Sequence, residues 1–396
     1  MHSLPNDHTG TRIARLRRER HLTQQALGEL AGVSKSAITK IERNVLPLTP
    51  HVAAALARAM QVPVGRIVGQ PYEDELRVDE LDILIRPIRE ALDVYDLGVD
   101  PEISARSQRV LSDQAERLCA AVRAGEIKSA ASDVAGLIQE ATSAAHERGT
   151  REGWLILASL YRTAYDVAAK LGFPDLASLA LGRLDWAAQK ASCAVLGGMY
   201  QYLRALTYLR EGQYRTGNRL TALGLSTLQQ AEDTQERRVV TGQLHLGAAV
   251  MAGRAHDGET AHEHLTIAKQ IAQQTGEAPR VHWLAFGETN VRVHEVAVHT
   301  ELDQYGEAVE ASMGLRIPDD WPKSRSSHHF AELARAQLAI RDLQGSFQNL
   351  VRARRAAPQQ AKYHPTVRQT YAGLEAAHRQ LKDGFLSYGS WLSSSR

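Results

Sequence analysis

The amino-acid sequence predicts an all-α protein built in two parts, with five short helices in residues 1–69 and a long array of helical hairpins after them. Two patterns predict this fold class. Apolar residues recur three or four positions apart along most of the chain, which is the spacing of a helix with one buried face. Beyond residue 101, breaks between helices return about every forty residues, which indicates a repeat, and strand patterns are absent from that stretch of sequence.

The first two helices are marked by capping and stop signals. A basic helix is expected over residues 11–20, and Thr23 is a hydroxyl N-cap for a second helix. Gly32 should end that helix, because glycine tolerates the left-handed backbone of a sharp helix end. Val33 can then turn inward and seal the corner before the next helix. The residues expected to face inward from these two helices are Ile13, Leu16, Leu27, Leu30 and Ala31.

Ser34 caps a third helix that leaves a polar face free. Its inward residues are Ala37, Ile38 and Ile41. Its outward residues are Lys35, Ser36, Thr39, Lys40 and Arg43. A free face of this composition suits a DNA major groove, which is lined with phosphates and base acceptors. Two more helices are expected over residues 50–60, after the cap Thr49, and over residues 64–68.

The order and spacing of these five helices resemble the phage-repressor (XRE) type of helix-turn-helix domain. The motifs are Leu22-Thr23-Gln24 opening the second helix, Ala31-Gly32-Val33-Ser34 at the turn, and Ile38 with Ile41-Glu42-Arg43 in the third helix. The resemblance implies that Gln24 grips a backbone phosphate and that the third helix faces bases or phosphates. Residues 45–48 depart from the pattern, because they make the segment before the fourth helix one residue longer. The DNA-binding residues expected on this basis are Thr23, Gln24, Ser34, Lys35, Ser36, Thr39, Lys40, Arg43 and Asn44.

Charge is divided unevenly along the chain. Residues 1–69 hold ten Lys and Arg against four Asp and Glu, whereas the remaining residues hold 37 against 41. A basic module on a mildly acidic body favours phosphate contacts at one end. The two cysteines, Cys119 and Cys193, lack CxxC spacing, so neither a disulfide framework nor a zinc site is indicated. No apolar leader or membrane-length apolar stretch occurs, so a cytoplasmic location without a membrane partner is expected.

Residues 70–100 are expected to form a linker and a connector helix. The composition turns acidic over residues 72–75, and a helix rich in Leu and Ile should follow over residues 76–95. Pro87 should kink this helix or split it in two. Its apolar surface is larger than a solvated linker helix should show. The sequence therefore predicts packing on its own body or on a second subunit, and leaves both open.

Residues 101–396 are expected to form the hairpin array. Breaks fall at residues 171–174, 212–214, 253–258, 303–306 and 344–347, and each should divide a hairpin. Small residues that follow several breaks, such as Ala261 and Ala268, let neighbouring helices approach closely. With Leu246-Gly247 and Phe286-Gly287 in first helices and Gly212-x-Tyr214 at a turn, the array resembles a degenerate tetratricopeptide repeat domain.

The concave side of such an array is lined by the first helix of each repeat and holds extended peptides or helices. Placing the repeats in the tetratricopeptide frame puts a set of polar residues on that side, where they could hold a peptide backbone or a charged terminus. The expected ligand-binding residues are Arg162, Asp166, Tyr202, Arg210, Glu288, Arg292, Glu332 and Arg335. The alternative is ordinary solvated pairing, because several of them are spaced four apart.

Other residue types carry weaker indications. The aromatic residues concentrated in the middle of the body form either core or an apolar ligand site. They are Trp154, Tyr161, Tyr165, Trp186, Tyr200, Tyr202 and Tyr208. The histidines lack metal-site spacing, since His299 lies one residue too far from His294-Glu295 for HExxH. No phosphate loop, dinucleotide motif or nucleophile elbow is present, so neither a cofactor nor an enzymatic activity is expected.

An XRE-type domain joined to a tetratricopeptide-like body resembles the peptide-pheromone receptors of the RRNPP type. The resemblance implies a homodimeric, quorum-sensing transcription regulator whose DNA affinity is set by a peptide or small-molecule effector in the repeats. Two recognition helices must lie about 34 Å apart to enter successive major grooves, so small displacements would loosen binding. The alternative is a DNA-bound adaptor whose repeat domain docks a partner protein.

Overall fold

The computed structural model describes residues 9–46, 48–69, 78–377 and 383–393, and these residues form helices joined by turns and loops. Within the described ranges there is no β-strand, and the one strand-like pairing is an isolated bridge between Ala278 and Phe286. None of the described helices is long and apolar enough to span a membrane. The predicted all-α class is therefore confirmed. The acidic junction predicted over residues 72–75 lies outside the described residues.

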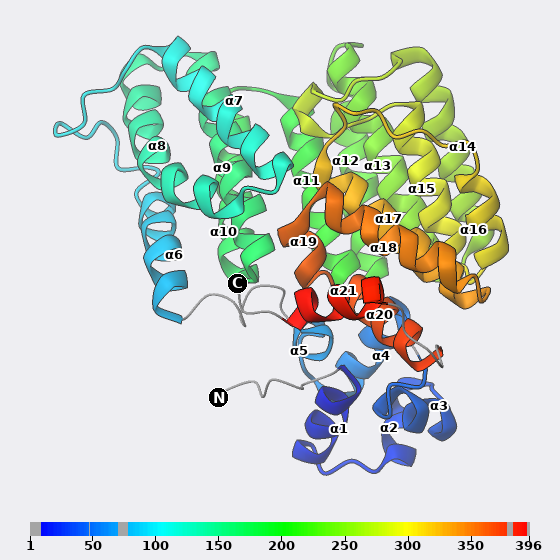
Figure 1. Cartoon of the computed structure of the whole chain (residues 1–396). Coiled ribbons are helices and arrows are strands. Elements are labelled where there is room, and N and C mark those ends of the chain that lie inside the picture. The colour runs from blue at the N-terminus through cyan, green and yellow to red at the C-terminus, as the bar shows by residue number, and fades with distance from the viewer. Residues whose placement is uncertain (1–8, 47, 70–77, 378–382, 394–396) are drawn as a thin grey trace.

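Five helices form an N-terminal domain with its own core (Figure 1): α1 (Thr9–Glu19), α2 (Gln24–Ala31), α3 (Lys35–Glu42), α4 (Pro50–Met60) and α5 (Val64–Val68). The predicted caps are present, because the side chains of Thr23, Ser34 and Thr49 each accept a hydrogen bond from a backbone amide in the first turn of the following helix. The core contains Ile13, Leu16, Leu27, Ile38, Ile41, Leu48, Leu56, Met60 and Ile67.

The turn between α2 and α3 forms as predicted, with one correction. Gly32 is left-handed (φ 68°), and Val33 packs against the domain core. Leu30, however, is 63% exposed and belongs to no core, although helical spacing placed it with Leu27. The reason is that α2 ends one residue later, so Leu30 lies in a last turn that no neighbouring helix covers.

The remaining helices form a body. They are α6 (Val78–Asp93), α7 (Gln108–Ala124), α8 (Ile127–Arg148), α9 (Arg151–Leu171), α10 (Pro174–Lys190), α11 (Ala194–Arg210), α12 (Tyr214–Leu228), α13 (Gln235–Arg254), α14 (Gly258–Thr275), α15 (Glu288–Glu301), α16 (Tyr305–Ser312), α17 (Lys323–Ala339), α18 (Leu343–Ala356), α19 (Pro358–Tyr363), α20 (Pro365–Ala377) and α21 (Asp383–Ser393), with a short 3-10 helix, η1 (Val281–Trp283), before α15.

Consecutive helices of the body pair as hairpins, from α7 with α8 to α17 with α18. The first helices α11, α13, α15 and α17 also pack on one another in that order, which makes a stack of hairpins. Helix α17 contacts α7, so the stack curls until a late hairpin meets the first one (Figure 1). Charged side chains on α7, α9, α11 and α17 can therefore act on one another.

The predicted breaks coincide with hairpin turns at four positions and miss at the fifth. Residues 344–347 lie inside α18, and the turn runs over residues 340–342. Asp342 supplies the physical reason, because its carboxylate accepts a hydrogen bond from the amide of Gly345 and caps α18. Gly345 is thus a first-turn helix residue, and its resemblance to a turn signal was misleading.

Helix α6 packs on the body of its own chain. Its residues Ile85, Ile88, Ala91 and Leu92 are buried in the same core as α8, α9 and α10. The helix continues through Pro87 as one element, so the predicted split does not occur.

Candidate functional sites

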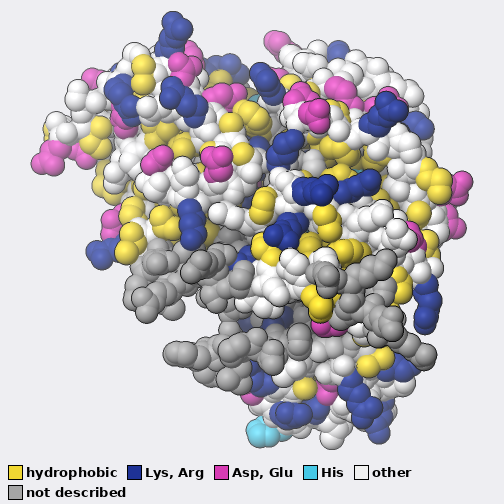
Figure 2. Space-filling model, viewed as in Figure 1, with side chains coloured by type: hydrophobic (Ala, Val, Ile, Leu, Met, Phe, Trp, Pro, Cys, Tyr) yellow, Lys and Arg dark blue, Asp and Glu magenta, His cyan; other side chains and the backbone are white. Residues whose placement is uncertain are grey.

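The outward face of α3 carries the cations predicted to meet DNA. Lys35, Ser36, Lys40 and Arg43 are exposed, and Thr39 is half-buried. Within the described residues, Lys35, Lys40 and Arg43 have no ion-pair partner. Helices α2 and α3 lie at the end of the domain remote from the body, where Lys and Arg side chains also gather on the surface (Figures 1 and 2). This face is therefore open to a large polyanion.

A buried ion pair fixes α3 against α1. The guanidinium of Arg17 donates to both carboxylate oxygens of Glu42, at 2.6 and 3.1 Å, and the two side chains are 11% and 7% exposed. The hydrogen bond to Glu42 raises the pKa of Arg17. Burial alone would raise the pKa of Glu42, but the hydrogen bonds from Arg17 and Gln24 outweigh it, and the pKa is lowered. The pair sets the angle at which α3 is presented.

Gln24 is held in place from two sides. Its amide nitrogen donates to Glu42 (2.8 Å), and its amide oxygen accepts from the hydroxyl of Thr39 (3.0 Å). An amide group has two N–H donors, so one remains for a phosphate oxygen. Thr23 and Ser34 lie at the N-termini of α2 and α3, where free backbone amides and the helix dipole favour an anion. The geometry is thus compatible with phosphate contacts at all three positions.

Asn44 mainly organises the domain. Its side-chain oxygen accepts from the amide of Gly10 at the start of α1 (3.1 Å), and its own backbone is left-handed (φ 55°). In the longer segment that follows, the amides of Val45 and Leu46 both donate to the carbonyl of Lys40. These bonds keep Val45 and Leu46 close to the end of α3, beside the predicted DNA-binding face.

Comparison with known proteins finds a match in this domain. Residues 13–67 match the helix-turn-helix family model. Comparisons with curated proteins and with solved structures find no match. The N-terminal domain is therefore an XRE-type helix-turn-helix, the DNA-binding domain of a regulator. The matched segment ends before α6, so the resemblance of the body to tetratricopeptide repeats stays a prediction.

Half of the predicted ligand residues gather in one charged group within the body. Asp166 on α9 pairs with Arg123 on α7 (2.6 Å), and Arg162 donates to the carbonyl of His282. Arg210 lies 3.5 Å from the hydroxyl of Tyr165. The hydroxyl of Tyr202 accepts from Gln243, which in turn accepts from Asn290. The charge of Asp166 acts on both Arg162 and Arg210.

Glu332 and Arg335 form a second group with partners that the sequence did not indicate. They pair with each other at 2.9 Å, and Arg335 also pairs with Glu301 at 3.3 Å. Glu301 then pairs with Arg254 at 3.3 Å. This chain of four charges runs from α17 across α15 to the C-terminal end of α13.

Glu288 and Arg292 do not join either group, which corrects that part of the prediction. Glu288 is exposed at the start of α15. The guanidinium of Arg292 donates to the carbonyl oxygens of Ala311 and Met313, at the end of the neighbouring helix α16. Unsatisfied carbonyls at a helix end attract a cation, and this attraction turns Arg292 away from the other residues.

Sequence reasoning missed three cations of the first group, Arg123, Lys170 and Arg325. Lys170 could have been found, because it lies four residues beyond Asp166 and eight beyond Arg162 on the same helix face. Arg123 and Arg325 could not, because their approach to α9 depends on the curling of the stack.

The aromatic residues of the middle body are mostly core. Tyr161 and Tyr165 are fully buried, and Trp154 and Trp186 pack edge to face at 5.3 Å between ring centroids. Burial raises the pKa of Tyr161 to about 12. In the described part of the chain, no group of three or more His, Cys, Asp or Glu side chains is arranged to hold a metal ion.

Proposed function

We propose that this chain is a sequence-specific transcriptional regulator whose DNA binding is modulated by a peptide or small molecule held in the helical body. The single observation that carries the proposal is that the DNA-binding domain docks on the body through named contacts. Modulation requires that a change in the body reach the DNA-binding domain, and these contacts provide the route.

Helix α4 and the start of α5 dock on the body. The ring of His51 lies 3.0 Å (Nδ1) from the carbonyl oxygen of Arg254, at the end of α13, and Arg58 donates to the carbonyl of Gly212 at 3.2 Å. The amide of Val64 also donates to Glu211. The contacts are made to the turns of two adjacent hairpins, α11–α12 and α13–α14. A change in the angle between these hairpins would therefore move α4.

Arg254 connects the docking contact to the interior of the body. Its backbone carbonyl faces the His51 ring, whereas its side chain pairs with Glu301. Glu301 in turn pairs with Arg335, which pairs with Glu332. A ligand that disturbs this chain would shift the end of α13. The proposal includes a homodimer, because the separation of two DNA-binding domains is the quantity that operator binding senses.

A glycine pair in the body tests the proposal. A Cβ at Gly212 would lie 2.2 Å from the Cβ of Ala54 in α4, so Gly212→Ala should force the DNA-binding domain off its docking site. Gly149→Ala is the matched control, because Gly149 is similarly left-handed (φ 61° against 67°) and has open space around it. Both variants carry the same backbone strain, about 1 kcal/mol.

The measurement is operator affinity of the full chain, by fluorescence anisotropy on a duplex selected from a random library. Gly212→Ala should change the affinity at least threefold, and Gly149→Ala should leave it unchanged. Equal affinities for both variants and the unmodified chain would show that docking does not influence DNA binding. Light scattering that gives a monomer with and without DNA would remove the dimer-spacing mechanism.

A further inference from the structure

We infer that the ligand site of the body takes a compact, multiply charged anion, such as a phosphate ester or a tricarboxylate, at a cluster of five cations. The cluster is Arg123 of α7, Arg162 and Lys170 of α9, Arg210 of α11 and Arg325 of α17. The inference deepens the proposed function, on which its regulatory part rests, by naming the chemical class of the effector.

The cluster carries far more positive than negative charge. Among the charged groups acting most strongly on Arg162, Lys170 and Arg325, Asp166 is the one carboxylate in the described part of the chain. It already pairs with Arg123 at 2.6 Å. Among the described residues, the other four cations have no carboxylate of their own; Arg162 is buried, Lys170 and Arg325 are half-buried, and Arg210 is exposed. Structural ion-pair clusters balance their charges, because a charge that is taken out of water without a partner is costly, and this cost falls on Arg162, Lys170 and Arg325.

The contacts that the remaining cations do make are to neutral groups. Arg325 donates to the side-chain oxygen of Asn290 (3.1 Å), Lys170 to Gln360 (3.5 Å) and Arg210 to the Tyr165 hydroxyl (3.5 Å). Arg162 is only 5% exposed and donates to a backbone carbonyl. Its Nε atom is buried and has no hydrogen-bond partner among the described residues. Neutral acceptors solvate these cations without cancelling their charge.

Burial and mutual repulsion lower the pKa values of Arg162, Lys170 and Arg325, whereas the neighbouring Tyr165 raises the pKa of Arg210. Burial, together with the charges of Arg123, Arg210 and Arg325, lowers the pKa of Lys170 to about 8 in spite of Asp166. Burial and Arg123 lower the pKa of Arg162 to about 10. Both side chains remain protonated near neutral pH, so the excess positive charge persists there.

Access and shape favour a small ligand. Arg123 and Asp166 keep 17% and 14% of their side-chain surface exposed, so water reaches the cluster. Lys and Arg side chains gather near the middle of the face shown in Figure 2, where α7 approaches α17. Guanidinium groups contributed by four helices match the several oxygens of a phosphate or carboxylate group. A planar guanidinium group binds a phosphate or carboxylate group through two parallel hydrogen bonds.

The test is calorimetric titration of the full chain, without DNA, at constant ionic strength in chloride. The probes are pyrophosphate and citrate, which separate a phosphate from a carboxylate source, and a hexa-aspartate peptide. One pyrophosphate or citrate should bind per chain, and Lys170→Gln and Arg325→Gln should each weaken it at least tenfold. Asp166→Asn should tighten it at least threefold, because it removes the competing carboxylate.

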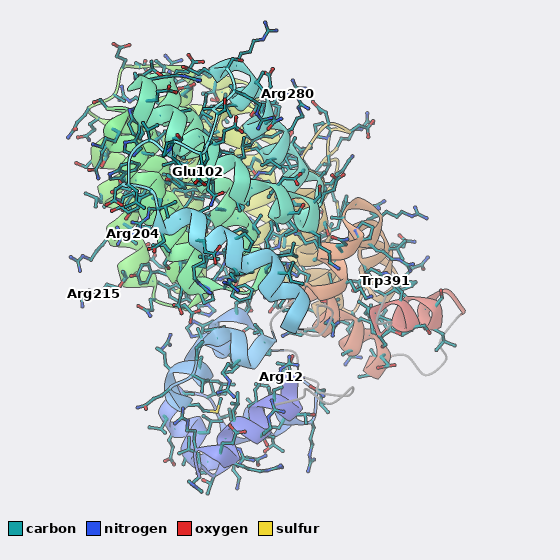
Figure 3. The ribbon with its side chains drawn as sticks, turned by 90° about the vertical axis from the view of Figure 1, so that its left-hand side faces the viewer. Arg12, Glu102, Arg204, Arg215, Arg280 and Trp391 are labelled. Atoms are coloured by element: carbon teal, nitrogen blue, oxygen red, sulfur yellow. The ribbon has the colours of Figure 1, made fainter. Side chains whose placement is uncertain are left out.

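Arg215→Gln is the matched control, because Arg215 lies on α12 and points away from the body (Figure 3). The affinity of the Arg215→Gln variant for the anion should equal that of the unmodified chain. Lys170→Gln should also raise the melting temperature of the anion-free chain, since it removes a half-buried cation from among like charges. A purely structural lysine would give a lower melting temperature and would contradict the inference.

Binding of the peptide alone, or equal anion affinity in Lys170→Gln and Arg215→Gln, would overturn the anion site. The two proposals fail separately. If the anion binds but leaves operator affinity unchanged, the regulatory role fails and the site stands. If Gly212→Ala changes operator affinity but no anion binds, regulation stands and the anion class is wrong.

Discussion

Replacing Lys35 and Lys40 by alanine should weaken operator binding and flatten its dependence on salt. Both side chains are exposed on α3 and lack an ion-pair partner within the described residues. Each phosphate contact that is lost lowers the slope of log K against log salt by about 0.9, so the double variant should lose about 1.8 per domain. At 0.15 M salt this corresponds to about 30-fold weaker binding, and at 0.05 M to about 200-fold.

The assay is fluorescence anisotropy with the selected operator at four or more potassium chloride concentrations. Arg66→Ala is the control, because Arg66 is an exposed cation on α5, at the side of the domain nearer the body. It changes the net charge of the domain but removes no contact of α3. Parallel salt slopes for the unmodified chain and the double variant would refute α3 as the DNA-contacting helix. A slope changed equally by Arg66→Ala would indicate a general effect of charge.

Three further predictions concern stability. Because the pKa of Glu42 is lowered in the folded chain, this carboxylate stabilises the fold fully above its ordinary pKa of 4.5, and the stabilisation is lost as the pH falls through the lowered pKa. Amide exchange of α3 should show this loss, and Glu42→Gln should abolish the pH dependence. Leu27→Ala should cost about 2–5 kcal/mol in urea unfolding of the N-terminal domain, whereas Leu30→Ala should cost less than about 0.5, and equal costs would contradict the exposure of Leu30. Asp342→Ala should cost about 1 kcal/mol and deprotect the first turn of α18 in amide exchange.

The N-terminal domain could be predicted closely because its signals are local. An N-cap side chain accepts a hydrogen bond from an amide three residues away, and a left-handed glycine ends the helix that precedes it. The roles of Thr23, Ser34 and Gly32 can therefore be predicted without knowledge of the tertiary structure. The Arg17–Glu42 pair joins residues 25 apart and escaped prediction, although both residues belong to helices that were expected. The spacing of residues predicts which side chains share a face of a helix, but not which residues of other helices that face contacts.

The interior of the body shows the same limit. Arg162 with Asp166 and Glu288 with Arg292 have identical spacing, yet only the first two enter a shared charged group, because α16 offers carbonyl oxygens to Arg292. The docking contacts were also beyond sequence reasoning, since Arg58 and Gly212 are 154 residues apart. The charged group forms only when the stack of hairpins brings α17 close to α7, and the docking contacts form only when the N-terminal domain packs on the body.

The docking geometry also bounds how strongly a ligand must act. Within the described residues, three hydrogen bonds, from or to His51, Arg58 and Val64, connect the two parts and contribute about 1 kcal/mol each, and the His51 ring also packs against Tyr214 and His256. Contacts of this number stabilise the docked state relative to the undocked state by an amount on the order of a few kcal/mol. A ligand that prefers one state by about 1.4 kcal/mol shifts their ratio tenfold. A ligand that displaces a charge of the chain from Glu332 to Arg254 would act at this point, because Arg254, the last member of the chain, also supplies the carbonyl that holds His51.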